Sequence, residues 1–400
     1  MKGSLLGRPG RNREPVPKVS GVPDPTSLRT VAESVVDPEL ECTLGQLNMV
    51  GALALSGTSL AITLALPIAA WPTADLVETN LRNALLAQDG VTSVEVERRT
   101  MSEDERIGLR TTLRSLMATH PEAKGDHGHA HGEPMPAFLS PDASTRVLGI
   151  SSGKGGVGKS SVTVNLAIAL AQQGKSVGVL DADVYGFSIP KMLGPNHDPI
   201  ILGDTVLPTA VHGVRCLSMG FFVPDEQPVI WRGPMLHKAI EQFVTEAYWG
   251  TPDFLLIDMP PGTGDVALTL SEVLPKVEMY VVTTPQPAAE RVAQRSAWAA
   301  RKMKLAVRGV IENMSFFTGD DGKRYELFGH GGGEELAKQL GVPLLGTVPF
   351  VPALREGGDE GMPVTVSDPD GVAGQAFSAL AEKIIAQGPA RVYRQELRIG

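Results

Sequence analysis

The sequence is short of cysteine, of long apolar runs and of positive charge. Two cysteines occur in 400 residues, Cys42 and Cys216, which excludes a disulfide framework and is typical of a reducing compartment. No apolar stretch approaches the roughly 20 residues that a membrane-spanning helix needs. The basic N-terminus is not followed by the apolar segment of a secretory signal. We therefore expect a cytoplasmic protein that does not associate with a membrane.

The charge balance excludes a further class of protein. Asp and Glu number 45 against 36 Lys and Arg, a formal net charge of −9. No positive field is available to attract a nucleic-acid backbone, so we expect no nucleic-acid partner. Hydrophobic residues make up 42% of the chain and charged residues 20%, which is a globular composition. The length exceeds one ordinary core and predicts two or three domains.

Composition and periodicity divide the chain into five parts. The first and third parts are rich in Pro and Gly and lack periodicity, which is typical of disordered segments and linkers. The second and fourth parts carry the apolar patterns of folded domains. The predicted parts are a disordered lead-in at 1–25, a small α+β domain at 26–117, a linker at 118–145, a larger domain at 146–388 and a tail at 389–400.

The two predicted domains differ in how their strands and helices alternate. The small one reads as helix, strand, helix, strand, with the strands at 58–66 and 91–96 and the second helix at 74–86. In the larger one, short apolar runs recur after helical segments, which predicts βαβ units around a buried parallel sheet. We therefore expect a doubly wound, mostly parallel α/β fold. Its predicted strands are VLGIS, SVGVL, FLLID, MYVVTTP, VRGVIENM and LLGTVPF.

A phosphate-binding loop follows the first of these strands. Gly153, Gly158, Lys159 and Ser160 satisfy the pattern G-x-x-x-x-G-K-[ST] between a predicted strand and a predicted helix. The glycines let backbone N–H groups point at a phosphate, and the helix adds its positive dipole end. Lys159 should bridge the β- and γ-phosphates, while the Ser160 hydroxyl should ligate Mg²⁺. The sequence thus predicts an ATP site that also includes Lys154, Gly155, Gly156, Val157 and Ser161.

Later strands end in residues suited to the same site. Asp183 follows the strand SVGVL, and Asp258 ends FLLID in the Walker-B pattern. Open α/β sheets bind ligands at the carboxyl ends of their strands, so Asp258 should hold Mg²⁺ and Asp183 should order water. A turn-capping aspartate is the alternative for Asp183. The Gly262 N–H in PPGTGD is expected to sense a γ-phosphate, and Pro349 in TVPF is expected to line the base pocket.

The loop GKGGVGKS resembles that of the deviant Walker-A ATPases, which include MinD, ParA, the nitrogenase iron protein and Mrp. The resemblance implies a homodimer in which Lys154 reaches the partner subunit's nucleotide, linking ATP occupancy to dimer geometry. It implies that Asp183 is the switch-I aspartate that positions water, and that Asn313 in VIENMS recognises adenine. A solvated lysine and a turn-stabilising amide are the alternatives for Lys154 and Asn313.

Further motifs resemble the Mrp branch, the ApbC-like ATPases. These are DADVYGFSIPKMLG, VIWRGPMLHKAI, DMPPGTGD, FGHGGG and REGGDEGMPV, and the resemblance covers residues 146–388. It implies slow, Mg²⁺-dependent ATP hydrolysis and delivery of an iron–sulfur cluster to apoproteins or assembly factors. VVDPELECTLGQLNMV resembles a segment of the small iron–sulfur-assembly-associated domain that often precedes such ATPases.

The sequence departs from that family at both expected cysteine sites. The family's C-x-x-C would fall at about Gly319 and Gly322, and the residues between them are aspartates, which are hard oxygen ligands. In the small domain Trp71 stands where relatives often carry a cysteine before a proline. A [4Fe–4S] cluster is therefore implied by the resemblance and opposed by the residues, so the cluster ligands stay unassigned.

The cysteines and histidines that are present offer no obvious substitute site. Cys216 lies in an apolar run and is expected to be a small buried hydrophobe. A packing or turn role is expected for Cys42, with a cluster ligand or reactive thiol as the alternative. The linker histidines at 127, 129 and 131 are expected to be solvated, with a transition-metal site as the alternative.

Three functions follow from these observations. The leading hypothesis is an ATP-hydrolysing iron–sulfur cluster carrier or assembly factor that works as a dimer. The alternative is a regulatory or scaffold ATPase switch of the same family that lost its C-x-x-C. A MinD-like membrane-cycling protein is disfavoured, because residues 390–400 are only loosely patterned as an amphipathic helix.

Overall fold

The computed structural model describes residues 24–117, 136, 138, 140, 143–183, 186–222, 233–262, 265–274 and 276–390. The chain forms two compact units that divide between Leu109 and Arg110, inside helix α3 (Glu103–Met117). The sequence placed this boundary at the end of that helix. Residues 1–23 of the lead-in, the linker histidines and residues 391–400 of the tail lie outside the described residues.

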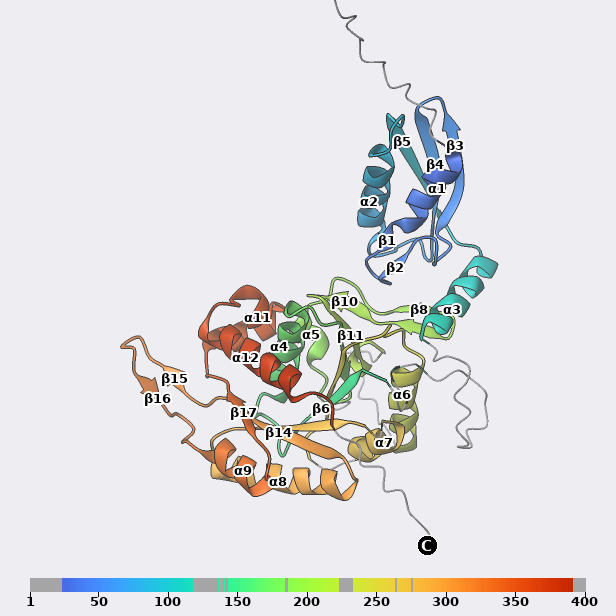
Figure 1. Ribbon diagram of the computed structural model, residues 1–400. Coiled ribbons are helices and arrows are strands. Elements are labelled where there is room, and N and C mark those ends of the chain that lie inside the picture. Colours follow the sequence, from blue (N-terminus) through green and yellow to red (C-terminus); the bar gives the residue numbers. More distant parts are fainter. Residues whose placement is uncertain are drawn as a thin grey trace, which may run out of the picture. The chain divides into compact units, whose positions relative to one another are not determined.

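The N-terminal unit is a three-stranded sheet with helices α1 and α2 beside it (Figure 1). The Asp24 carboxylate accepts hydrogen bonds from the Thr26 and Ser27 N–H groups and so caps α1. Strands β3 and β4 are antiparallel, while β5 runs parallel to β4 after the crossover through α2. The elements are α1 Pro25–Ser34, β1 Val36–Asp37, β2 Cys42–Thr43, β3 Val50–Ser56, β4 Ser59–Leu66, α2 Ala74–Leu86 and β5 Ser93–Thr100.

Helix α2 has the predicted bounds, but two strands of this unit differ from the prediction. The sequence missed β3, whose outward positions are filled by Ala and Ser rather than by clearly polar residues. It also ended β5 at Val96, where the hydrophobic alternation stops. The strand continues because its pairing with β4 extends to the Leu66–Thr100 pair. Backbone pairing, rather than side-chain pattern, therefore sets this end of the strand.

The C-terminal unit contains an eight-stranded sheet in the order β10-β11-β7-β12-β6-β13-β14-β17. All neighbours are parallel except β10, which is antiparallel to β11 at one edge. The predicted mostly parallel α/β sheet is confirmed, although β11 was not among the predicted strands. The strands are β6 Arg146–Ser152, β7 Val177–Asp181, β10 Thr209–Val211, β11 Val214–Ser218, β12 Phe254–Asp258, β13 Glu278–Thr283, β14 Ala306–Glu312 and β17 Leu344–Thr347.

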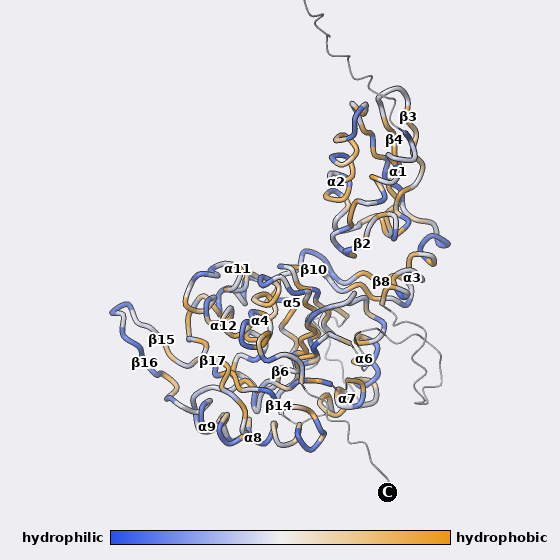
Figure 2. The backbone as a smooth tube through the Cα atoms, in the orientation of Figure 1, coloured by the Kyte–Doolittle hydropathy of each residue, from blue (hydrophilic) through white to orange (hydrophobic). Residues whose placement is uncertain are grey.

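Helices cover both faces of this sheet, so its central strands are buried along their length and carry mainly apolar residues (Figures 1 and 2). Successive residues of β12 point to opposite faces: Leu256 joins the core beneath α4 and α12, whereas Leu255 and Ile257 join the core beneath α6 and α7. The helices are α4 Lys159–Gln172, α5 Ile189–Leu193, α6 Gly233–Thr245, α7 Asp265–Val273, α8 Pro287–Lys302, α9 Gly332–Leu340, α10 Pro352–Glu360, α11 Val364–Ser367 and α12 Val372–Gln387.

Three shorter elements lie outside the main sheet. Two are hairpins, β8 (Ile200–Leu202) with β9 (Thr205–Leu207) and β15 (Phe317–Thr318) with β16 (Arg324–Tyr325). The third is the 3₁₀-helix η2 (Met219–Phe222), which follows β11 directly. Among the described residues, no helix is long and apolar enough to span a bilayer.

A buried polar cluster joins the amino ends of two central strands. The Arg146 guanidinium at the start of β6 pairs with the Glu278 carboxylate at the start of β13, at 2.6 Å. It also donates to the Tyr280 hydroxyl at 3.0 Å. Burial and the Glu278 charge raise the pKa of Tyr280 to about 12. This cluster lies at the end of the strands opposite to the loop that follows β6.

Candidate functional site

The predicted phosphate-binding loop leaves β6 after Ser152 and enters α4 at Lys159. Gly156 and Gly158 have φ values of 80° and 79°, which L residues with a side chain rarely adopt. A Cβ at Gly153 would collide with the backbone of α8 at Val292 and Ala293. Gly156 and Gly158 are therefore required by the backbone conformation of the loop, and Gly153 is required by its close packing against α8.

Lys159 and Ser160 both contact the Walker-B carboxylate. The sequence assigned Ser160 and Asp258 to one Mg²⁺ site but did not predict the Lys159 contact. Lys159 Nζ lies 2.5 Å from Asp258 Oδ2, and Ser160 Oγ donates to the same oxygen at 2.6 Å. The other carboxylate oxygen accepts from Thr163 Oγ1 at 2.6 Å. Asp258 is fully buried and Lys159 is 7% exposed, and such buried charges require close partners. Hard oxygen atoms of Ser160 and Asp258 are thus within reach of one point, which fits Mg²⁺ chemistry.

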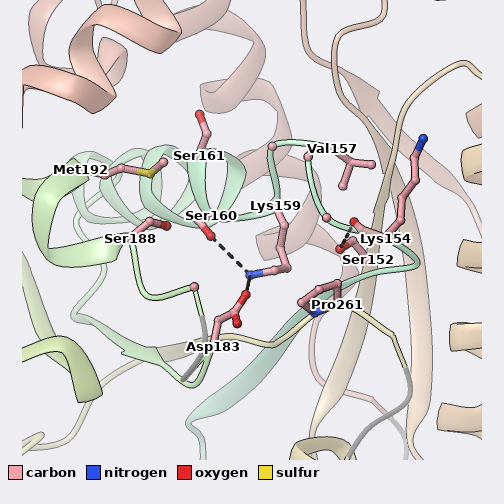
Figure 3. A pocket seen from close by; sticks show the side chains of 14 residues that line it. Ser152, Lys154, Val157, Lys159, Ser160, Ser161, Asp183, Ser188, Met192 and Pro261 are labelled. Atoms are coloured by element: carbon pink, nitrogen blue, oxygen red, sulfur yellow. Dashed lines mark hydrogen bonds and ion pairs between the residues drawn. The ribbon is translucent and has the colours of Figure 1, made fainter. Parts of the chain in front are cut away.

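Asp183 is a second carboxylate close to the Lys159 ammonium. Its Oδ2 atom is 3.5 Å from Lys159 Nζ, and its side chain faces the pocket in Figure 3. Burial raises the pKa of Asp183, while the Lys159 charge opposes that rise. Asp181, two residues earlier, is deeper in the fold. Burial and the neighbouring Asp258 carboxylate raise the pKa of Asp181 to about 7.

A cavity of about 230 Å³ opens over the loop and contains most of the predicted ATP-binding residues. Lys154 and the loop from Gly155 to Ser161 line it, together with Asp183. Five lining residues were not predicted: Ser152, Gly186, Ser188, Met192 and Pro261. Pro261 adjoins the predicted Gly262. Ser188 is the N-cap of α5 and Met192 lies within it, and this helix of five residues is too short for a periodic signal.

Lys154 points away from Lys159 (Figure 3). Its Nζ donates to Gln286 Oε1 at 3.4 Å, at the N-cap of α8. The two loop lysines therefore have different surroundings. One ammonium is buried against carboxylates, and the other is half-buried beside an amide.

Five predicted site residues do not line this cavity: Gly153, Asp258, Gly262, Asn313 and Pro349. The Gly262 N–H donates to the Ser152 carbonyl at 2.9 Å, so contact with a γ-phosphate would require that bond to open. Asn313 Nδ2 donates to the Val157 carbonyl at 2.9 Å. Pro349 is buried just after β17. Asn313 thus holds the phosphate-binding loop, and its predicted contact with adenine stays a prediction, as does that of Pro349.

Comparison with known proteins settles the family. Residues 143–385 match the model of the NUBPL iron-transfer P-loop NTPases, and residues 26–97 match that of an iron–sulfur cluster assembly protein. The chain belongs to the NUBPL iron-transfer P-loop NTPase family. This confirms the resemblance drawn from the motifs, and P-loop NTPases of this kind are nucleotide-hydrolysing enzymes.

Relatives extend over nearly the whole chain. It is 42% identical to an iron–sulfur cluster carrier protein of Mycobacterium leprae, over 89% of this chain and 91% of the relative. It is 40% identical to one of Synechocystis sp., over 90% of this chain and 96% of the relative. A nucleotide-binding protein of Archaeoglobus fulgidus solved with ADP is 33% identical, with a TM-score of 0.50, over 59% of this chain and 92% of that one.

The β15–β16 hairpin occupies the place where the family resemblance predicts a C-x-x-C. The Gly322 N–H donates to the Gly319 carbonyl at 2.9 Å, which closes the hairpin turn. Gly322 has a φ of 73°, and a Cβ at Gly319 would lie 2.9 Å from the Tyr325 ring. Asp321 Oδ2 accepts from the Tyr325 hydroxyl at 2.9 Å. A glycine-dependent turn therefore stands where the resemblance predicts thiolates.

The second expected cysteine position is also filled. The Trp71 indole N–H donates to Asp37 Oδ2 at 2.8 Å, and both residues are buried. Cys42 is buried in the same unit, whereas Cys216 is buried at the centre of β11 in the other. Burial, with the Asp181 charge, raises the pKa of the Cys216 thiol, which disfavours the thiolate that metals bind. Among the described residues, no group of three or more His, Cys, Asp or Glu side chains could hold a metal ion.

Asn313→Ala tests what this amide does. The variant leaves the Val157 carbonyl without its partner and loosens the loop, so we expect ATP and GTP affinities to fall together, by about tenfold. Equilibrium titration with both nucleotides measures this. Asn83→Ala, on the exposed face of α2, is the matched control and should change neither. A fall in affinity for ATP but not for GTP would show that Asn313 recognises adenine rather than holding the loop.

Proposed function

We propose that this chain is an ATP-binding and ATP-hydrolysing iron–sulfur cluster carrier or assembly factor, working as a cytoplasmic homodimer. The observation that carries the enzymatic part is the buried contact of Lys159 and Ser160 with one Asp258 oxygen. The relatives named iron–sulfur cluster carrier proteins support the cargo part.

The proposed reaction uses the residues of the cavity in distinct roles. Lys159 exchanges its carboxylate partner for phosphate oxygens and neutralises charge that develops on the γ-phosphate. Ser160 and Asp258 are the residues that would hold Mg²⁺, which supplies charge neutralisation between the β- and γ-phosphates. Asp183, 3.5 Å from Lys159, accepts a hydrogen bond from the attacking water and so positions it.

Lys154 is the residue that we assign to the dimer. Its ammonium points away from the Lys159 site of its own subunit (Figure 3), and its Gln286 contact of 3.4 Å is weak. In a homodimer it would reach the partner subunit's phosphates. ATP would then stabilise one dimer arrangement, and hydrolysis would release it.

Cluster delivery to apoproteins or other assembly factors is the proposed output of this cycle. A resident [4Fe–4S] cluster shared by two subunits needs four soft ligands. The Gly319–Gly322 turn and the burial of both cysteines oppose such a site in the isolated chain. We therefore infer that any cargo is held with thiolates that a partner supplies. The same turn supports the alternative, a regulatory or scaffold switch that kept the ATPase cycle alone.

The two loop lysines form a matched pair for testing the ATPase. Lys159→Ala should lower kcat for ATP hydrolysis by at least about a hundredfold in a folded chain, because a cation that stabilises the transition state is lost.

Lys154→Ala should leave ATP affinity within about threefold of wild type while reducing hydrolysis and nucleotide-dependent dimerisation. Phosphate release and light scattering measure these effects. Unchanged turnover in Lys159→Ala would refute the site, and collapsed ATP affinity in Lys154→Ala would refute the trans role.

Cluster binding is tested by anaerobic reconstitution followed by iron and sulfide analysis. The isolated wild type should hold a [4Fe–4S] cluster well below one per dimer, because no spaced cysteine pair is present. Any residual cluster should disappear in the Cys42→Ser, Cys216→Ser double variant. A stable stoichiometric cluster in the wild type would contradict this account of the hairpin. Retention in the double variant would require ligands other than thiolates of this chain.

A further inference from the structure

One buried carboxylate ties both ends of the segment that carries Asp183. Asp181 ends β7, and its Oδ1 atom accepts from the Asp183 N–H at 3.1 Å. Its Oδ2 atom accepts from the N–H of Ile189, the first residue of α5, at 3.3 Å. Asp183 and Ile189, at the two ends of this segment, are therefore bonded to the same side chain.

The same carboxylate also has a partner on the neighbouring strand. Ser218 ends β11 and lies beside Asp181 in the parallel register. Its hydroxyl donates to Asp181 Oδ2 at 3.0 Å and accepts from the Gly220 N–H at 3.0 Å. Asp181 is 1% exposed and Ser218 is 0% exposed. Because this interaction is shielded from water, its geometry is well defined and costly to lose.

Packing adds a second restraint to the segment. A Cβ at Gly220, in η2, would lie 2.5 Å from the Phe187 ring, so the ring rests directly on the η2 backbone. Neither Asp181 nor Ser218 lines the cavity over the phosphate-binding loop, whereas Asp183 does. Any effect of the first two residues on the reaction must therefore pass through the position of the segment.

We propose that Asp181 is a positioning residue for ATP hydrolysis and that Ser218 supports it. Together they fix Asp183 against the Lys159 ammonium, so that water is held in line with the γ-phosphate. This inference rests on the proposed function. A displacement of about 1 Å of a water-positioning carboxylate costs on the order of a hundredfold in rate. Loss of the hydrogen bonds to Asp181 should therefore lower the rate of hydrolysis, although Asp181 does not line the nucleotide cavity.

Asp181→Asn tests the inference with little change of shape. An amide has one acceptor oxygen where the carboxylate has two, so in either orientation at least one of the three N–H and O–H donors loses its partner. We expect kcat to fall by about tenfold or more while KM and the directly measured ATP affinity change by less than about threefold. Ser218→Ala should give a smaller fall of the same kind, and Ser218→Thr, which keeps the hydroxyl, should restore kcat.

The double variant separates a shared role from two independent ones. If Ser218 acts through Asp181, adding Ser218→Ala to Asp181→Asn should lower kcat little further, since the interaction is already lost. Tyr280→Phe is the control for stability alone. It also removes a buried hydroxyl bonded to a carboxylate, at the opposite ends of the strands. It should lower the melting temperature without changing kcat.

Each outcome decides the question. An unchanged kcat in Asp181→Asn would overturn the inference while leaving the ATPase proposal intact. The same holds if the fall in kcat of the double variant equals the product of the falls in the two single variants. A kcat in Tyr280→Phe that falls as far as that of Ser218→Ala would reduce the role to fold stability and would also overturn it. A wild type without ATP hydrolysis would refute the proposed function, and this inference with it.

Discussion

The ammonium of Lys159 is largely buried at the carboxyl edge of the sheet, where little water can reach it. It is held there by Asp258 at 2.5 Å and approached by Asp183 at 3.5 Å. Removing a charge from water costs several kcal/mol unless partners replace the solvent. The sheet order brings these partners together, because β12 lies between β6 and β7 and all three strands end at the same level. The Lys159 ammonium is thus held in a position from which it can bind the oxygens of an incoming phosphate.

The parts of this site that the sequence predicted are those with a local cause. The loop 153–161 is bounded by a strand and a helix, and Asp258 ends a run of four buried apolar residues. The fold class followed from strands that are apolar on both faces. By contrast, Ser188 and Met192 reach the cavity from the short helix α5, and Gly194, which ends that helix, packs against the backbone of Gly361. No local pattern signals a contact between glycines so far apart in the chain.

Two features that the sequence did not predict also depend on tertiary contacts. The strand β11 was overlooked because its five residues are identified by pairing with β7 rather than by length or alternation. The Asn313 amide donates to the Val157 carbonyl, 156 positions away in sequence, a contact that the sequence did not predict, while its predicted contact with adenine stays a prediction. The missing cysteines were visible from the sequence. Only the structure shows that Gly319 and Gly322 are needed for a turn and that Trp71 holds Asp37.

The account depends on the Asp258 carboxylate, which organises Lys159, Ser160 and Thr163 at once. The most direct measurement is the Mg²⁺-dependent rate of ATP hydrolysis by Asp258→Asn, compared with wild type in chains whose circular dichroism spectra agree. The amide cannot neutralise Lys159 or hold the cation, so the account predicts that Mg²⁺-dependent hydrolysis is lost, a fall of at least about a hundredfold. Hydrolysis at the wild-type rate with the same Mg²⁺ dependence would contradict it.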